Sequence, residues 1–360
     1  MSTSSAQPHP EPTLPRRRLL TGTAAVAGGV LATGSLATPA RAGAVAESVA
    51  AVPAQLLRPP KLRTGDKVRL VSPAGPPNPT LVARGEELLR SWGLQVEYAP
   101  HALGRYGYLA APDADRLADL NAALADPTVR GVVCCRGGYG VQRIIDGVDV
   151  QAVRKDPKPL VGFSDITGLQ LWLWRAAGLA TVHGPMAQWN DARTGPESAE
   201  ALRSSLMTTD PIVIHRDPAE IGADVEVPGT ATGVLLGGNI SLLSAAVGNR
   251  ELPGLRGAIL FLEEVGEAPY RIDRMLTQLR RCGALTGIAG VALGQYVDCE
   301  GAAGTWTVSE LLRDRLADLG VPVIGGLPLG HGTGQLTIPL GVPATIDTTA
   351  GTLTVEPAVR

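Results

Sequence analysis

The chain of 360 residues predicts an α/β protein. From Gly65 to the segment after Ser164, short apolar runs alternate with amphipathic helical patterns. This alternation is typical of a parallel sheet covered by helices on both faces. The second half continues the alternation and closes with short strands. A hydrophobic share of 44% with only 18% charged residues is enough to fill a sizeable core.

The first 42 residues predict an export signal of the twin-arginine type. Arg16, Arg17 and Arg18 precede a moderately apolar run, and Ala40-Arg41-Ala42 fits a cleavage site with small flanking residues. The apolar run is interrupted by glycines, so we expect no retained membrane anchor. We therefore expect a protein that folds before export and is extracytoplasmic, either secreted or associated with the cell wall.

Removal of the signal leaves a mildly acidic chain. The 42 residues carry four Arg and one Glu, so the net charge changes from −2 to about −5 over the remaining 318 residues. This balance argues against nucleic acid or an anionic membrane as a partner. A chain of that length fits one large or two ordinary domains.

Cysteine spacing matches no zinc site, and two of the four cysteines are adjacent. Folding before export also disfavours a disulfide framework. We expect mostly buried thiols; a bond from Cys134 or Cys135 to the C-terminal half is the alternative. The four cysteines are Cys134, Cys135, Cys282 and Cys299.

Composition divides the rest of the chain into four segments. Residues 43–60 are rich in Ala and Pro and predict a flexible leader. Residues 61–190 form the expected N-terminal domain. A loop-like stretch with mixed charges then predicts a linker over residues 191–224, and residues 225–360 form the expected C-terminal domain.

In the first half, the helical segments show apolar residues at helical spacing, as at Leu117, Leu120 and Leu124. The expected elements are a strand between Gly65 and Ser72, a helix over Arg84–Trp92, a strand over Leu94–Tyr98, a helix over Asp113–Ala125, a strand over Val129–Cys135 and a strand running into Ser164.

The second half predicts a glycine-rich turn that opens a helix over Gly229–Leu243. The further expected elements are a strand over Gly257–Glu263, a helix over Tyr270–Cys282, a strand over Gly290–Gln295, a helix over Val308–Leu319 and short strands that end near Thr352–Val355.

Ser164 follows a short apolar run and a turn at Gly162, and a helical pattern follows it. A serine on a sharp turn between strand and helix is the arrangement of a nucleophile elbow. The alternative is that Ser164 only caps the helix, with Asp165 and Thr167 in its first turn.

Two further residues could complete a catalytic set. His331 lies between two glycines, which predicts a tight loop, although a solvated loop histidine fits equally well. Glu263 ends an apolar strand, where parallel sheets place their working groups and where an acid can orient an imidazole. The alternative for Glu263, and the favoured interpretation for Glu264 and Glu267, is an ion-pair network with Arg271 or Arg274.

Gly137 and Gly138 follow an apolar strand and predict a turn whose backbone N–H groups can face a ligand. No Gly-Lys-Ser/Thr follows, so this is not a phosphate-binding P-loop. An oxyanion could instead be held by one N–H from this turn and a second from Asp165.

Together these stretches resemble the LD-carboxypeptidase family of serine peptidases, which includes the microcin C immunity peptidases. The resemblance covers about residues 61–360. It is carried by Gly65-Asp66 through Ser72-Pro73-Ala74, Arg136-Gly137-Gly138-Tyr139-Gly140, Gly162-Phe163-Ser164-Asp165, Gly237-Gly238-Asn239, Leu262-Glu263-Glu264 through Tyr270-Arg271-Ile272-Asp273-Arg274, and Gly330-His331-Gly332.

The resemblance implies an N-terminal open, mostly parallel sheet domain that carries the nucleophile. It also implies a C-terminal β-rich α/β domain that carries the acid and the histidine. By motif position Ser164 is the nucleophile, Glu263 the acid and His331 the base. The backbones of Gly138 and Asp165 are the oxyanion donors. The resemblance further implies a homodimer with no metal, and we expect no cofactor.

The implied reaction is removal of the terminal D-alanine from murein tetrapeptides through an acyl-enzyme. One alternative is a related peptidase that hydrolyses peptidyl- or aminoacyl-nucleotide antibiotics, with Trp189 or Trp306 as the aromatic platform for a base. The other is a non-catalytic protein that binds wall peptides. Asn239 is the candidate for a substrate-facing group, and a structural role in its turn is the alternative.

Overall fold

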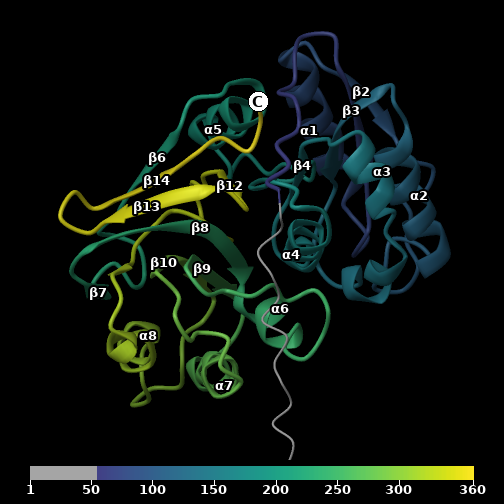
Figure 1. Ribbon diagram of the computed structural model, residues 1–360. Helices are drawn as coiled ribbons and strands as arrows, with labels where there is room; N and C mark the ends of the chain where they lie inside the picture. Colours follow the sequence, from purple (N-terminus) through teal and green to yellow (C-terminus); the bar gives the residue numbers. More distant parts are fainter. Residues whose placement is uncertain (1–54) are drawn as a thin grey trace, which may run out of the picture. The chain divides into compact units, whose positions relative to one another are not determined.

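Two β-sheets organise residues 55–360, which are the part of the chain described by the computed structural model (Figure 1). The expected signal over residues 1–42 and the first part of the expected leader lie outside the described residues. The mixed α/β fold predicted from the sequence is confirmed.

The N-terminal sheet has six strands in the order β12-β5-β4-β3-β1-β2. β1 to β5 are mutually parallel, and β12 joins antiparallel to β5. The strands are β1 (Lys67–Val71), β2 (Gln95–Tyr98), β3 (Val129–Cys134), β4 (Leu160–Gly162), β5 (Thr181–His183) and β12 (Ile338–Leu340). The connecting helices are α1 (Pro79–Ser91), α2 (Asp113–Ala125), α3 (Val150–Lys155) and α4 (Ile166–Ala177).

Helix α1 begins five residues before the expected start at Arg84. The side chain of Asn78 caps it by accepting from the N–H groups of Thr80 and Leu81, and Pro79 occupies its first turn. Asn at the cap and Pro at the first position are both favourable, because the cap satisfies orphan N–H groups and Pro has none to satisfy. The start signal was therefore in the sequence, ahead of the apolar pattern.

The C-terminal sheet has eight strands in the order β6-β14-β13-β8-β9-β10-β11-β7. Its centre, from β8 to β11, is parallel, and the strands outside this centre pair antiparallel. The strands are β6 (Ile212–His215), β7 (Glu226–Val227), β8 (Thr230–Asn239), β9 (Ala258–Val265), β10 (Gly290–Val297), β11 (Val323–Ile324), β13 (Pro343–Asp347) and β14 (Thr352–Val355). The helices α6 (Ile240–Ala245), α7 (Pro269–Arg281) and α8 (Val308–Leu316) accompany them.

The prediction of a glycine-rich turn over Gly229–Leu243 was wrong. Most of that stretch is the long strand β8, and only its end opens the short helix α6. Its glycines are required by close packing: a Cβ on Gly237 would lie 2.0 Å from the Phe261 carbonyl oxygen, and one on Gly238 would lie 2.6 Å from Thr167 Oγ1. Glycine in a strand permits such an approach of another backbone or side chain.

The expected linker over 191–224 contains regular structure. It includes α5 (Pro196–Met207) and β6, which pairs with β14 in the eight-stranded sheet. Polar composition concealed α5, which exposes much of its surface. β6 is a short edge strand of four residues. The domain boundaries expected at residues 190 and 225 stay predictions.

Order also begins before Lys61, within the expected flexible leader. The Leu57 N–H donates to Gly178 O at 2.7 Å, and the Arg360 N–H donates to Pro59 O at 2.9 Å. The segment is therefore held between the end of α4 and the C-terminus. None of the four cysteines, all in the described part, forms a disulfide.

Helix α4 connects the two sheets. Thr167, in its first turn, accepts from the Asn239 N–H at the end of β8, with 3.2 Å between the two atoms. Near its other end, the buried Trp174 donates from its indole nitrogen to Gly341 O at 3.2 Å. Asp165, the residue before α4, is consequently fixed relative to the end of β8.

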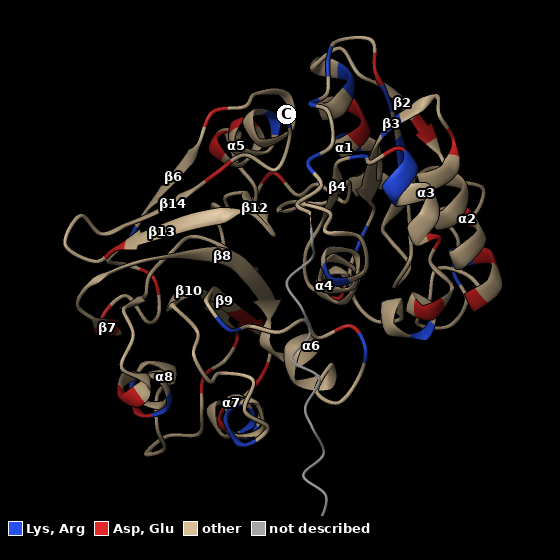
Figure 2. Ribbon diagram, in the orientation of Figure 1, with Lys and Arg blue, Asp and Glu red and all other residues tan. Residues whose placement is uncertain are grey.

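Charged residues lie mainly on helices such as α1, α2, α7 and α8, whereas the strands of both sheets are mostly uncharged (Figure 2). This distribution is typical of helices that cover buried sheets. Within residues 55–360, no helix has the length and apolar character needed to cross a membrane.

His183, at the end of β5, is fully buried between the rings of Phe163 and Phe261, with centroid distances of 5.8 and 5.0 Å. Neither ring nitrogen has a hydrogen-bond partner among the described residues. Burial is the main cause that lowers the pKa of His183 to about 4, with His331 adding to it and Glu263 opposing it. The ring is therefore neutral at neutral pH.

This burial predicts a pH-dependent loss of stability. The unfolded chain protonates His183 near its ordinary pKa, so between pH 7 and 5 the unfolded state binds more protons than the folded state. The free energy of unfolding should fall by about 2 kcal/mol over this range from His183 alone. Denaturant unfolding at several pH values should show a shallower dependence for His183→Leu than for the wild type.

The exposed His215 gives the matched control, because its replacement leaves the buried ring in place. We expect His215→Leu to keep the wild-type slope. Equal slopes for the wild type and His183→Leu would contradict the prediction.

Candidate active site

Ser164 occupies a sharp turn between β4 and α4. Its φ is 63°, in the left-handed region that non-glycine residues rarely adopt. The turn also requires Gly162, because a Cβ there would lie 2.6 Å from Ile166 Cγ2. Strain of this kind costs about 1–3 kcal/mol and concentrates at functional sites. The predicted elbow is therefore present in the backbone.

The turn after β3 lies directly against Ser164. A Cβ on Gly137 would lie 2.8 Å from Ser164 Cβ and 3.2 Å from the Asp165 nitrogen, so only glycine fits. The Gly137 carbonyl accepts from the Gly75 N–H at 3.0 Å, which fixes the turn. The N–H groups of Gly138 and Asp165 have no hydrogen-bond acceptor among residues 55–360.

The side chain of Asp165 binds a different segment and not its own backbone N–H group. It accepts from the Val141 N–H at 2.9 Å, and burial raises its pKa despite that hydrogen bond. Asp165 thus connects the start of α4 to the segment after the glycine turn and leaves its own N–H free.

Glu263 and His331 form a close pair. Glu263 lies in the central strand β9 with no exposed surface, and its Oε2 is 2.6 Å from His331 Nδ1. Burial alone would raise the pKa of Glu263, but His331, and more weakly His183, hold it below the ordinary value. Because an ionised carboxylate only accepts hydrogen bonds, Nδ1 carries the donated proton and Nε2 can accept one.

The glycines beside His331 have separate steric reasons. A Cβ on Gly330 would lie 2.9 Å from Glu263 Oε2, so it would obstruct the pair. A Cβ on Gly332 would lie 2.4 Å from Gln295 Nε2, and the Gly332 N–H donates to Gln295 Oε1 at 2.8 Å. Neither position beside His331 therefore has room for a side chain.

Ser164, His331 and Gly138 line one cavity of about 300 Å³. Phe163 also lines it, and its ring centroid lies 4.7 Å from that of His331. The structure records no hydrogen bond between the Ser164 hydroxyl and His331 within residues 55–360; without a ligand such bonds are often long. The structure thus brings together five of the six residues singled out from the sequence.

Asn239 is the sixth, and it does not line this cavity. It is 3% exposed, its oxygen caps α6 by accepting from the Leu242 N–H, and its amide donates to Glu264 at 2.9 Å. Glu264 also accepts from Ser241. Of the two ion pairs favoured from the sequence, the described residues contain the one between Glu267 and Arg271, at 3.3 Å, and none from Glu264.

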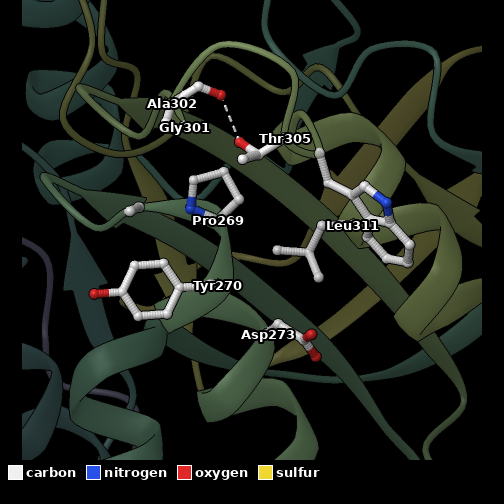
Figure 3. A pocket seen from close by; sticks show the side chains of 9 residues that line it. Pro269, Tyr270, Asp273, Gly301, Ala302, Thr305 and Leu311 are labelled. Carbon is white, nitrogen blue, oxygen red and sulfur yellow. Dashed lines mark hydrogen bonds between the residues drawn. The ribbon is translucent and has the colours of Figure 1, made fainter.

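Neither tryptophan proposed as an aromatic platform lines the Ser164 cavity. Trp189 is 5% exposed and packs in the core. Trp306 is half exposed and borders a separate pocket of about 530 Å³ at the start of α7, where Tyr270, Asp273 and Leu311 surround the space (Figure 3).

Three residues near the Ser164 cavity were not predicted from the sequence: His183, Arg193 and Gln335. Arg193 and Gln335 line the Ser164 cavity, and His183 contacts Phe163. Arg193 lies in a polar stretch assigned to a linker, and Gln335 has no motif of its own. Within residues 55–360 no group of three or more His, Cys, Asp and Glu side chains is arranged to hold a metal ion.

Two family models match the chain. The LD-carboxypeptidase N-terminal domain matches residues 68–184, and the LD-carboxypeptidase C-terminal domain matches residues 232–346. The first match contains Ser164 and the glycine turn. The second contains Glu263 and His331.

Individual proteins agree with these matches. A Streptomyces coelicolor protein with a carboxypeptidase name is 46% identical over 84% of this chain and 97% of its own length. The murein tetrapeptide carboxypeptidase of Pseudomonas aeruginosa is 31% identical, with 78% of this chain and 93% of that protein covered. The crystal structure of an MccF-like protein from Bacillus anthracis has a TM-score of 0.75 at 25% identity, with 83% and 99% covered. The chain therefore belongs to the LD-carboxypeptidase family, and it is a serine-type carboxypeptidase.

Proposed function

We propose that this protein is an exported LD-carboxypeptidase that removes the terminal D-alanine from murein tetrapeptides. Ser164 acts as nucleophile, His331 as base and Glu263 as the acid that orients His331. The observation that carries the proposal is the buried pair of Glu263 and His331, which borders the cavity shared with Ser164. The name of the Pseudomonas aeruginosa relative supports the substrate class.

The reaction is an acyl transfer in two steps. His331 Nε2 takes the hydroxyl proton of Ser164 as Oγ attacks the carbonyl carbon of the diamino acid. The N–H groups of Gly138 and Asp165 hold the resulting oxyanion. The C–N bond breaks, His331 protonates the leaving amine of D-alanine, and water attacks the ester with His331 again as base.

The residue environments suit this sequence of events. Glu263 remains ionised because its pKa is held low, so it can stabilise the imidazolium that forms after proton transfer. The unoccupied N–H groups lie beside Ser164, where negative charge would develop. Export is supported by the sequence of residues 1–42, and the homodimer implied by the resemblance stays a prediction that light scattering can test.

We expect Ser164→Ala and His331→Ala to abolish hydrolysis, because each removes a group that no neighbour replaces. The measurement uses protein from Gly43 onward with purified murein tetrapeptide and follows D-alanine by mass spectrometry. The fall in kcat should be on the order of 10⁴-fold or more. Ser91→Ala, on the exposed end of α1, should keep wild-type activity.

Circular dichroism must show that each variant is folded. Release that survives Ser164→Ala would refute the nucleophile assignment. A folded wild type that releases no D-alanine would refute the murein assignment, and a peptidyl-nucleotide would be the next substrate.

Glu263→Gln tests the orienting acid. The amide keeps the size of the side chain but removes the charge that stabilises the imidazolium. We expect kcat to fall by roughly 10²- to 10⁴-fold, with KM little changed. Steady-state kinetics on the tetrapeptide measure both constants.

The neighbouring Glu264→Gln is the matched control, since Glu264 accepts hydrogen bonds from Asn239 and Ser241 and does not line the cavity. It should lower the melting temperature and keep kcat close to the wild-type value. If the two variants lost kcat equally, a specific role for Glu263 would be untenable.

A further inference from the structure

Arg193 contributes a charged side chain to the cavity that contains Ser164 and His331. Its guanidinium is partly buried, and both Nε and Nη2 are shielded from solvent. Neither nitrogen has a hydrogen-bond partner among residues 55–360. Leaving the donors of a charged group unpaired in a protein interior is costly, so a partner from outside the chain is expected.

Gln335 presents a second unpaired donor in the same cavity. This residue is 1% exposed, and its Nε2 has no partner among the described residues. One backbone hydrogen bond places it near Arg193: the Gly334 N–H donates to Arg193 O at 2.8 Å, and Gln335 is the residue after Gly334. Unpaired donors therefore occur on two neighbouring segments of the wall.

The turn that carries Arg193 is fixed. The N–H groups of Arg193 and Thr194 both donate to Asn190 O, at 2.9 and 2.7 Å. The Thr194 hydroxyl donates to the same oxygen at 2.7 Å. The bond from Gly334 also joins this turn to the loop of His331. The unpaired guanidinium is thus held by ordered backbone.

The charges around the cavity favour an anion. The residues that line it include two arginines and no Asp or Glu. Arg136, the other arginine, is exposed, and its Nη1 already donates to Pro76 O at 2.8 Å. Burial lowers the pKa of Arg193, an effect that Glu263 and Asp298 oppose, and Glu263 Oε2 is occupied by His331.

We propose that the guanidinium of Arg193 binds the C-terminal carboxylate of the substrate, with the Gln335 amide as an additional donor. The inference rests on the proposed function. A planar guanidinium matches a carboxylate with two parallel hydrogen bonds. Only the last residue of a peptide has this carboxylate.

Recognition of that group would explain how the enzyme cuts a single residue from the end. With the carboxylate held by Arg193, the preceding carbonyl is presented to Ser164, and an internal peptide bond lacks the anchoring charge. The leaving D-alanine would stay bound by Arg193 until the amine is protonated.

The test compares a tetrapeptide that ends in a free carboxylate with the same peptide ending in a carboxamide. We expect the wild type to prefer the acid. In Arg193→Gln, kcat/KM for the acid should fall roughly 10- to 100-fold, as expected for loss of a charge-assisted pair, and kcat/KM for the amide should change little. The acid-to-amide ratio should therefore approach one.

Arg136→Gln is the matched control, because it removes the other cavity arginine with the same change in charge. It should retain the acid-to-amide ratio of the wild type. Gln335→Glu, which replaces a donor with an anion of the same size, should lower the ratio. Arg193→Lys, which keeps the charge but not the planar edge, gives an intermediate ratio and serves if Arg193→Gln does not fold.

Three results would overturn the assignment while leaving the proposed function intact. They are a wild type without preference for the acid, an equal loss on both peptides in Arg193→Gln, and loss of the ratio in Arg136→Gln alone. A folded wild type that cleaves neither peptide would instead overturn the proposed function, and this inference with it.

Discussion

The buried pair of Glu263 and His331 constrains much of the surrounding structure. Glu263 lies in the centre of an eight-stranded sheet, where a carboxylate without a partner would be strongly disfavoured. Removing one member of such a pair typically costs about 3–5 kcal/mol. Several neighbouring residues can be understood as keeping this pair dry and correctly oriented. They are Gly330, Gly332, Gln295 and the neutral His183.

For Ser164 to lie near this pair, the end of β4 in one sheet must come close to β9 in the other. The chain achieves this with α4, whose first turn contacts the end of β8 through Thr167 and Asn239. It also returns β12 to the N-terminal sheet, beside β5 and His183. Gly238 permits the close approach of Thr167. Asn239 is best understood within this junction, since its backbone meets α4, its side chain caps α6, and its amide satisfies Glu264.

Local chemistry made part of this arrangement predictable. A strand, a glycine and a serine before a helix predict an elbow because few other conformations accommodate them, and Ser164 has the backbone expected there. The strand β3 was recognised from its mostly apolar run, and five of its six residues are buried. In contrast, β8 has three glycines in ten residues and was mistaken for a turn. Its glycines respond to Phe261, Thr167 and Gly257, which are distant in sequence.

The same limit explains why the polar wall of the cavity was missed. Arg193 lies in a sequence that resembles any exposed loop, and Gln335 lies in a glycine-rich one. Their significance depends on what they lack, namely partners for buried donors, and this emerges only when the turn at Asn190 and the loop of His331 are joined by the Gly334 N–H.

The chain has a small net negative charge, yet the described residues that line this cavity include two arginines and no carboxylate. The cavity therefore has an electrostatic preference opposite in sign to the net charge of the chain. The preference favours a substrate whose charge lies one residue beyond the bond to be cut. Chemistry at Ser164 and His331 and selection at Arg193 would then be separate tasks. The Gly334 N–H joins the turn of Arg193 to the loop of His331 by a backbone hydrogen bond.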